Sequence, residues 1–170
     1  MKSEIKRITI LSLFIAVSLA LFSIELLIPP FPFSPSSKIG LANTVTLFML
    51  SNKHFFKTRD CFTVLVSRCI LSAVITGRIM SVAFSLTGGI FALLSMIIIR
   101  KLFGKSIILM SIIGAVFHNM AQMLVAVCIY GTFSALYYIP ALFITGVLSG
   151  IITGLCILAI DKVKIIKLME

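Results

Sequence analysis

The stretch SIILMSIIGAVFHNMAQMLVAVCIY, residues 106–130, contains no charged side chain along its whole length. A helix that crosses the ~30 Å hydrocarbon core of a bilayer needs about 20 mostly apolar residues, and this stretch supplies them. Comparable apolar runs lie at residues 8–28, 61–77, 79–99 and 136–160, and a shorter one lies at residues 39–51. The sequence therefore predicts an all-α membrane protein built as a bundle of six transmembrane helices.

The overall composition agrees with a lipid environment. Of the 170 residues, 60% are hydrophobic and only 12% are charged, whereas a soluble domain is about half apolar and a quarter charged. Six spans with short connections use up this length, so we expect a single integral membrane domain over residues 1–170. The apolar run at 8–28 exceeds the core of a secretory signal peptide and is interpreted as a retained first helix.

The net charge of +10 comes from basic clusters placed between alternate apolar runs. Nucleic acid is not an expected partner, because basic and aromatic residues are not interleaved as in nucleic-acid-binding proteins. Short loops rich in lysine and arginine stay cytoplasmic, so both termini are predicted to lie on the cytoplasmic side of a bacterial cell membrane. Twelve of the 15 basic residues fall on that side: Lys2, Lys6, Arg7, Lys53, Lys57, Arg59, Arg100, Lys101, Lys105, Lys162, Lys164 and Lys167.

The other three basic residues are Lys38, Arg68 and Arg78. Lys38 and Arg78 fall on the outer side, where either could pair with Glu25 or bind an anionic group of a ligand; the ion pair is the favoured interpretation. Arg68 lies within a predicted span, about 10 Å from its cytoplasmic end. It either contacts a polar partner or extends its charged group to the membrane surface, and we favour the second alternative.

Polar side chains within the predicted spans are the candidates for ligand binding, because such groups are costly in lipid and often functional. His118 and Gln122 are one turn apart and share a helix face, with Asn119 beside them, and Asn43 falls near the outer side. These residues either contact a substrate in an outward-opening cavity or form hydrogen bonds between helices. The Pro-rich segment at residues 29–38 cannot form a regular helix and is a candidate lid.

Two stripes of small residues recur at every fourth position. Gly146, Gly150 and Gly154 predict close helix packing, because no large side chain separates the backbones. Ala16 and Ala20 form the other stripe together with Ser12. Their spacing is compatible with internal packing or with docking of another membrane subunit.

Several kinds of catalysis are not expected. The chain lacks a Walker A motif, and its two aspartates, Asp60 and Asp161, are too few for the clustered carboxylates that hold magnesium against a diphosphate. The four cysteines lack the spacing of metal ligands, and a haem with two axial histidines is disfavoured because His54 falls in a predicted loop. We therefore expect no catalytic residues, no metal, no cofactor and no enzymatic activity.

Four segments resemble one family, in the same order along the chain: KIGLANTVTLF (38–48), SLTGGIFALLSM (85–96), SIIGAVFHNMAQMLVA (111–126) and YIPALFITGVLSGIITG (138–154). This is the Gx transporter family, whose members are often labelled heptaprenyl diphosphate synthase component I. The family is similar to the S components of energy-coupling-factor transporters, which are six-helix substrate-binding proteins.

The resemblance implies a membrane subunit that captures a small vitamin-like or isoprenoid-like molecule from outside. Ala16 and Ala20 match the stripe through which S components meet a transmembrane coupling subunit, which works with separate ATPases. The resemblance also places the ligand pocket beneath residues 29–38, close to His118, Asn119 and Gln122. The alternative is a non-catalytic membrane component of heptaprenyl diphosphate or menaquinone synthesis, or of quinone-linked extracellular electron transfer.

Overall fold

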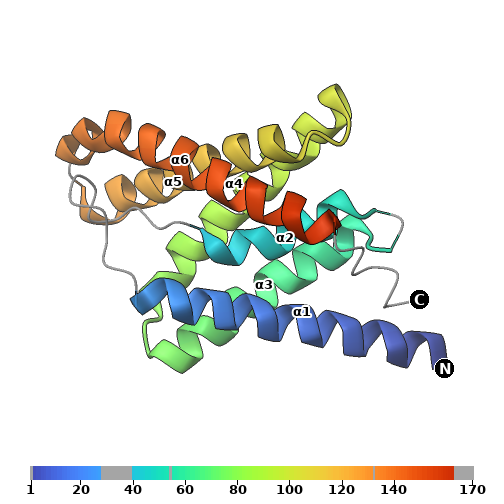
Figure 1. Ribbon diagram of the computed structural model, residues 1–170. Coiled ribbons are helices and arrows are strands. Elements are labelled where there is room, and N and C mark those ends of the chain that lie inside the picture. Colours follow the sequence, from blue (N-terminus) through green and yellow to red (C-terminus); the bar gives the residue numbers. More distant parts are fainter. Residues whose placement is uncertain (1, 28–39, 54, 132, 163–170) are drawn as a thin grey trace.

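The computed structural model describes residues 2–27, 40–53, 55–131 and 133–162, and this part of the chain is almost entirely helical (Figure 1). The candidate lid at residues 29–38, Lys38 included, lies outside the described residues, as does the C-terminal tail. The elements in chain order are α1 (Lys2–Leu27), α2 (Leu41–Ser51), α3 (Thr58–Thr76), α4 (Met80–Phe103), α5 (Ile107–Tyr130), the 3₁₀ helix η1 (Phe133–Tyr138) and α6 (Ile139–Lys162). The predicted all-α class is confirmed.

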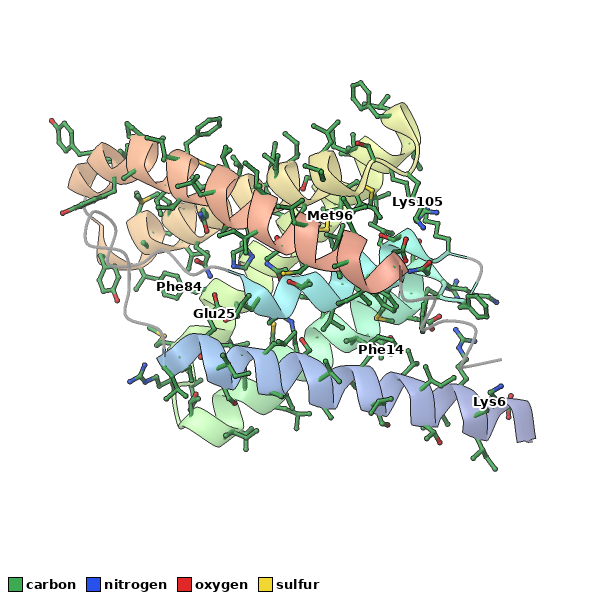
Figure 2. The ribbon with its side chains drawn as sticks, viewed as in Figure 1. Lys6, Phe14, Glu25, Phe84, Met96 and Lys105 are labelled. Carbon is green, nitrogen blue, oxygen red and sulfur yellow. The ribbon has the colours of Figure 1, made fainter. Side chains whose placement is uncertain are left out.

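Successive helices run in opposite directions, so that the start of α1 and the end of α6 lie at the same end of the bundle (Figure 1). Lys6 and Lys105 both lie at this end, whereas Glu25 lies toward the opposite one (Figure 2). Two ion pairs link helix termini there, Arg7 with Asp60 and Lys105 with Asp161. The described basic clusters thus gather at one end of the bundle.

Within the described residues, four segments are long and apolar enough to cross a membrane: Glu4–Leu27, Met80–Phe103, Ile107–Tyr130 and Leu136–Asp161. The two remaining helices differ. α3 has 19 residues but carries Arg59, Asp60 and Arg68, and α2 has only 11 residues, which rise ~16 Å or about half of the hydrocarbon core. The helices therefore fit a multi-pass membrane bundle, while the count of six spans stays a prediction.

The short helix α2 is the centre of the bundle. It contacts α1, α3, α4, α5 and α6, and every residue from Ala42 to Ser51 is buried. Phe48 stacks on Phe14 of α1 with ring centroids 5.8 Å apart, and Figure 2 shows Phe14 pointing from α1 into the bundle. The five longer helices thus form a shell around α2.

The outer surface is apolar, as contact with lipid requires. Leu27, Val74 and Ile79 are 84%, 74% and 81% exposed, and many other large aliphatic and aromatic side chains are exposed as well. Soluble monomers rarely expose contiguous apolar surface on this scale. This surface is suited to the hydrocarbon of a bilayer.

The glycine stripe of α6 faces α5. A Cβ atom at Gly146 would lie 3.0 Å from the Val116 Cα atom, and one at Gly150 would lie 2.5 Å from the Ile112 Cα atom. The third glycine, Gly154, sits against Ile108 in the same way. Because the neighbouring atoms belong to the α5 backbone, a larger residue can be accepted only if the two helices separate.

This packing predicts a difference between two glycine substitutions. Gly150→Ala should lower the free energy of unfolding by about 1–3 kcal/mol, the usual effect of overpacking, because its methyl group meets the α5 backbone. Gly89→Ala should have a smaller effect, since its new methyl group meets only the flexible end of Leu65. Unfolding in detergent, followed by circular dichroism, measures both values, and equal losses would contradict the proposed role of backbone contact.

Candidate functional site

The start of α2 lies inside the bundle and is tied to α1. The backbone N–H of Gly40, which precedes α2, donates a hydrogen bond to the Glu25 carboxylate. Gly40 has a φ of 74°, a left-handed conformation that glycine adopts without steric strain. Glu25 is itself buried, with 8% exposure. This contact fixes the position of the first turn of α2, which carries Asn43 and Thr44.

Asn43 connects α3 and α5 through its side-chain amide. The Arg68 guanidinium donates a 2.6 Å hydrogen bond from Nη2 to the Asn43 Oδ1 atom, and the Asn43 Nδ2 atom lies 3.1 Å from Nδ1 of His118. All three side chains are buried, and Glu25 interacts electrostatically with Arg68. The result is a chain of polar groups through the middle of an apolar bundle.

The direction of this chain follows from the chemistry of its first member. A guanidinium can only donate, so Asn43 must present its carbonyl oxygen to Arg68 and its NH₂ group to His118. Nδ1 of His118 is then the acceptor, which assigns the ring proton of the neutral imidazole to Nε2. Nε2 is therefore the hydrogen-bond donor of the His118 ring.

A glycine of α4 makes room for the histidine. A Cβ atom at Gly88 would lie 2.7 Å from His118 Cε1 and 3.0 Å from Gln122 Cγ, distances that a real side chain does not adopt. Gly89 faces the other way, against Leu65 of α3. The pair Gly88–Gly89 thus allows α4 to approach α5 and α3 at the level of the polar chain.

A small cavity adjoins these residues. It lies between α2, α4, α5 and α6, and its walls include Asn43, Thr44, His118, Asn119 and Ser149. Its volume is about 10 Å³, which is roughly the space that one water molecule needs. The polar groups on its walls come from three different helices, so the cavity depends on the assembled bundle.

Three of the four buried residues predicted to bind substrate, Asn43, His118 and Asn119, line this cavity, and Gln122 does not. Asn43 and His118 are hydrogen-bonded, and Gln122 is buried next to His118 and against Gly88. Asn119 also lines the cavity, but its side chain donates to the backbone oxygen of Leu142 in α6. Asn119 thus contributes to helix–helix contact as well.

The other two residues predicted to contact substrate, Arg78 and Lys38, are not among the residues that the structure places at the cavity. Arg78 is exposed in the turn between α3 and α4, away from the cavity, and Lys38 lies outside the described residues. The alanines of the predicted docking stripe, Ala16 and Ala20, are exposed on α1, as is Ser12. Their face is opposite to the one that buries Ser18 and Phe22.

The favoured interpretation of Arg68 was wrong. Its side chain does not extend to the membrane surface but is buried, with 6% exposure, and contacts Asn43. The physical reason is that α2 brings the Asn43 amide oxygen to the middle of α3. This oxygen is closer to the guanidinium than the membrane–water interface is. Sequence reasoning also assigned no role to Thr44, whose hydroxyl is buried without a hydrogen-bond partner.

Among the described residues, no group of three or more histidine, cysteine, aspartate or glutamate side chains is arranged to hold a metal ion. The groups that surround the cavity are amide, imidazole and hydroxyl groups, with one guanidinium behind them. Such groups can bind a ligand oxygen by hydrogen bonding.

A sequence model of the family described as heptaprenyl diphosphate synthase component I matches residues 14–160. The chain belongs to this family. The component I family label predicted from the four sequence segments is thus confirmed, and the match extends from α1 to α6. Searches of curated proteins and of solved structures gave no match.

Membership in the component I family relates the chain to a component of a prenyl diphosphate synthase. Both the cavity and the Arg68–Asn43–His118 chain lie within the matched region. The segments that suggested the family, KIGLAN and GAVFHNMAQ, contribute Asn43 and His118 to this site. The residues on which the resemblance rested are therefore neighbours in space.

The polar chain predicts a specific pattern of stability. Asn43→Leu should lower the free energy of unfolding by about 3 kcal/mol or more, because it leaves the Arg68 guanidinium buried without its partner. Adding Arg68→Met should recover part of this loss by removing the stranded charge. A double-mutant cycle in detergent measures the coupling, and strictly additive losses would show that the two side chains act independently.

Proposed function

We propose that this chain is a membrane-embedded binding subunit that captures a small vitamin-like or isoprenoid-like molecule from outside for uptake. The observation that carries the proposal is the Arg68–Asn43–His118 chain beside a cavity in the middle of an apolar bundle. Buried ionisable groups are costly in a membrane and are usually retained for function. In this proposal Asn43, His118 and Gln122 contact the ligand, and Asn119 holds α6 against the site.

The proposed direction of capture rests on charge. Basic residues of short loops stay on the cytoplasmic side, which would place Arg7, Lys53, Arg100 and Lys105 inside. The end of the bundle near Leu27 and Arg78 then faces outward. In this orientation both termini are cytoplasmic and α2 lies in the inner half of the bilayer. The cavity at the start of α2 then lies near the middle of the bilayer, and the proposal requires that a ligand reach it from the outer side.

Uptake would require partner subunits, because the sequence has no nucleotide-binding motif of its own. We propose that a transmembrane coupling protein docks on the exposed small-residue face of α1 and that separate ATPases supply energy. Small side chains let a second helix approach closely in lipid. Ala16 and Ala20 lie on the outer face of α1, where such a helix has access.

A second candidate function is favoured by the family match itself. The component I label indicates a membrane component of heptaprenyl diphosphate synthesis, which would place the chain beside a catalytic partner in isoprenoid or menaquinone synthesis, or in quinone-linked electron transfer. In this alternative the same site would bind an isoprenoid without transporting it. The two candidates differ in whether a coupling subunit associates with α1.

The ligand site is tested by removing its polar groups. His118→Ala and Gln122→Ala should each reduce the fraction of gently purified protein that carries a small molecule, because each removes a hydrogen-bonding group from the site. Native mass spectrometry measures that fraction, and Ser95→Ala is the control, since Ser95 is buried but bonds only within α4. Equal occupancy in all four proteins would remove His118 and Gln122 from the site.

Docking on α1 is tested by adding bulk to its exposed face. The double substitution Ala16→Leu and Ala20→Leu should abolish co-purification of a coupling subunit from native membranes, because leucine prevents close helix approach. Thr63→Leu combined with Ala83→Leu adds bulk at exposed positions of α3 and α4 and should leave the complex intact. Unchanged association in the α1 double variant would contradict this docking site.

A further inference from the structure

A second hollow lies on the lipid side of the candidate site. It is a groove of about 360 Å³ between α1 and α6, floored by α2, and Figure 1 shows the ribbon of α2 between those of α1 and α6. Its volume is within the range of small-molecule sites. The walls are apolar and include Leu13, Val17, Leu21, Val45, Phe48 and Ile157. Leu13 and Val17 are 58% and 43% exposed, so the groove is open to the hydrocarbon around the protein.

Thr44 joins the groove to the polar cavity. It lines both hollows, and its hydroxyl oxygen is buried without a hydrogen-bond partner in the described structure. Several other helical hydroxyls bond to their own helix, as Ser51 does with Leu47 and Thr76 does with Ser72, and Ser18 bonds to a neighbouring helix at Ala42. An unsatisfied hydroxyl in an apolar setting is unfavourable, so a ligand oxygen at this point would remove a penalty.

The sizes of the two hollows define the shape of the ligand. The groove has room for a long hydrocarbon chain, whereas the cavity has room for about one water-sized group. A hydroxyl or carbonyl oxygen meets that limit, and a diphosphate does not. The groove therefore suits a hydrocarbon chain with one small neutral polar group. That group reaches the Thr44 hydroxyl, which is covered in this structure, once the Thr44 side chain turns toward the groove.

Depth excludes an ordinary phospholipid from this arrangement. Thr44 precedes the end of α2 at Ser51 by seven positions, or about 10 Å along the helix, so it lies well inside the bundle. A charged phosphate headgroup stays at the membrane surface, because charge is costly in hydrocarbon. Only a lipid with a small neutral head can place its polar atom next to Thr44.

We propose that the groove between α1 and α6 binds the isoprenoid chain of a neutral lipid, whose hydroxyl or carbonyl oxygen contacts Thr44 and the Asn43–His118 pair. This rests on the proposed ligand-binding function and narrows its substrate class from vitamin-like or isoprenoid-like molecules to neutral prenyl lipids. The ligand enters from the bilayer, past Leu13 and Val17, with its chain in contact with α1, α2 and α6.

The test uses the full chain in nanodiscs of dioleoyl phosphatidylcholine with tritiated geranylgeraniol as the probe. Val17→Trp and, separately, Leu13→Trp fill the groove from its exposed wall, and each should weaken binding at least tenfold. Val74→Trp is the matched control, because Val74 is exposed on α3 and does not line the groove; its affinity should stay within twofold of the wild type.

The polar contact is tested by Thr44→Val, which keeps the shape of the side chain and removes its hydroxyl. Affinity for geranylgeraniol should fall about two- to tenfold, as expected for one lost hydrogen bond. Geranylgeranyl diphosphate should bind at least tenfold more weakly than the alcohol, because its head exceeds the cavity.

Several results would overturn the proposal. These are the absence of saturable geranylgeraniol binding, equal affinity in the Val17→Trp and Val74→Trp proteins, and equally effective displacement by oleyl alcohol, which would assign the groove to any membrane chain. Loss of a co-purifying coupling subunit in both Leu13→Trp and Val17→Trp, with geranylgeraniol affinity unchanged, would assign the groove to that subunit.

The ligand-binding function can survive the failure of this inference. If a water-soluble molecule co-purifies, is lost on His118→Ala and is retained in Val17→Trp, then the groove proposal is wrong and the polar site still binds a ligand. If no molecule depends on His118, both proposals fail.

Discussion

A guanidinium group within a lipid-embedded bundle must be satisfied by the protein, because hydrocarbon offers no hydrogen-bond partner. Arg68 meets this requirement in part: its Nη2 atom donates to Asn43 and Glu25 lies within electrostatic range, whereas its Nε atom is buried without a hydrogen-bond partner in the described structure. Both partners act at the start of α2, since Asn43 is in its first turn and Glu25 holds Gly40. The position of this short helix, the orientation of His118 and the placement of the polar cavity all depend on that one buried charge.

The helices were largely predictable from the sequence because four of them are long apolar runs, and α3 contains a similar run that is interrupted by Arg68. The uncharged stretch at residues 106–130 forms α5, which begins one residue later than the stretch does. Which face of each helix is buried was harder to predict. Alanine at positions 16 and 20 allowed both internal packing and an outer stripe, and only the buried positions of Ser18 and Phe22 show which way α1 turns.

The candidate site was predictable in part. His118, Asn119 and Gln122 are adjacent in sequence, but α5 directs His118 toward α2 and α4, and Asn119 toward α6. Arg68 was misjudged because its partner is 25 positions away, and helical periodicity carries no information about contacts over that range. The same limit applies to Gly88, which leaves space for the His118 imidazole of another helix. It also applies to Thr44, because the two hollows that Thr44 lines exist only in the assembled bundle.

The length of α2 has a consequence for how the protein is made. Eleven residues reach only about halfway through the hydrocarbon core, and the polar start of this helix would meet lipid if it entered the bilayer alone. Its partners in α3, α5 and α6 are synthesised later. Membrane insertion must therefore keep this segment in a protected place, at the interface or beside the insertion machinery, until the downstream helices arrive, which makes assembly around α2 a late step of biogenesis.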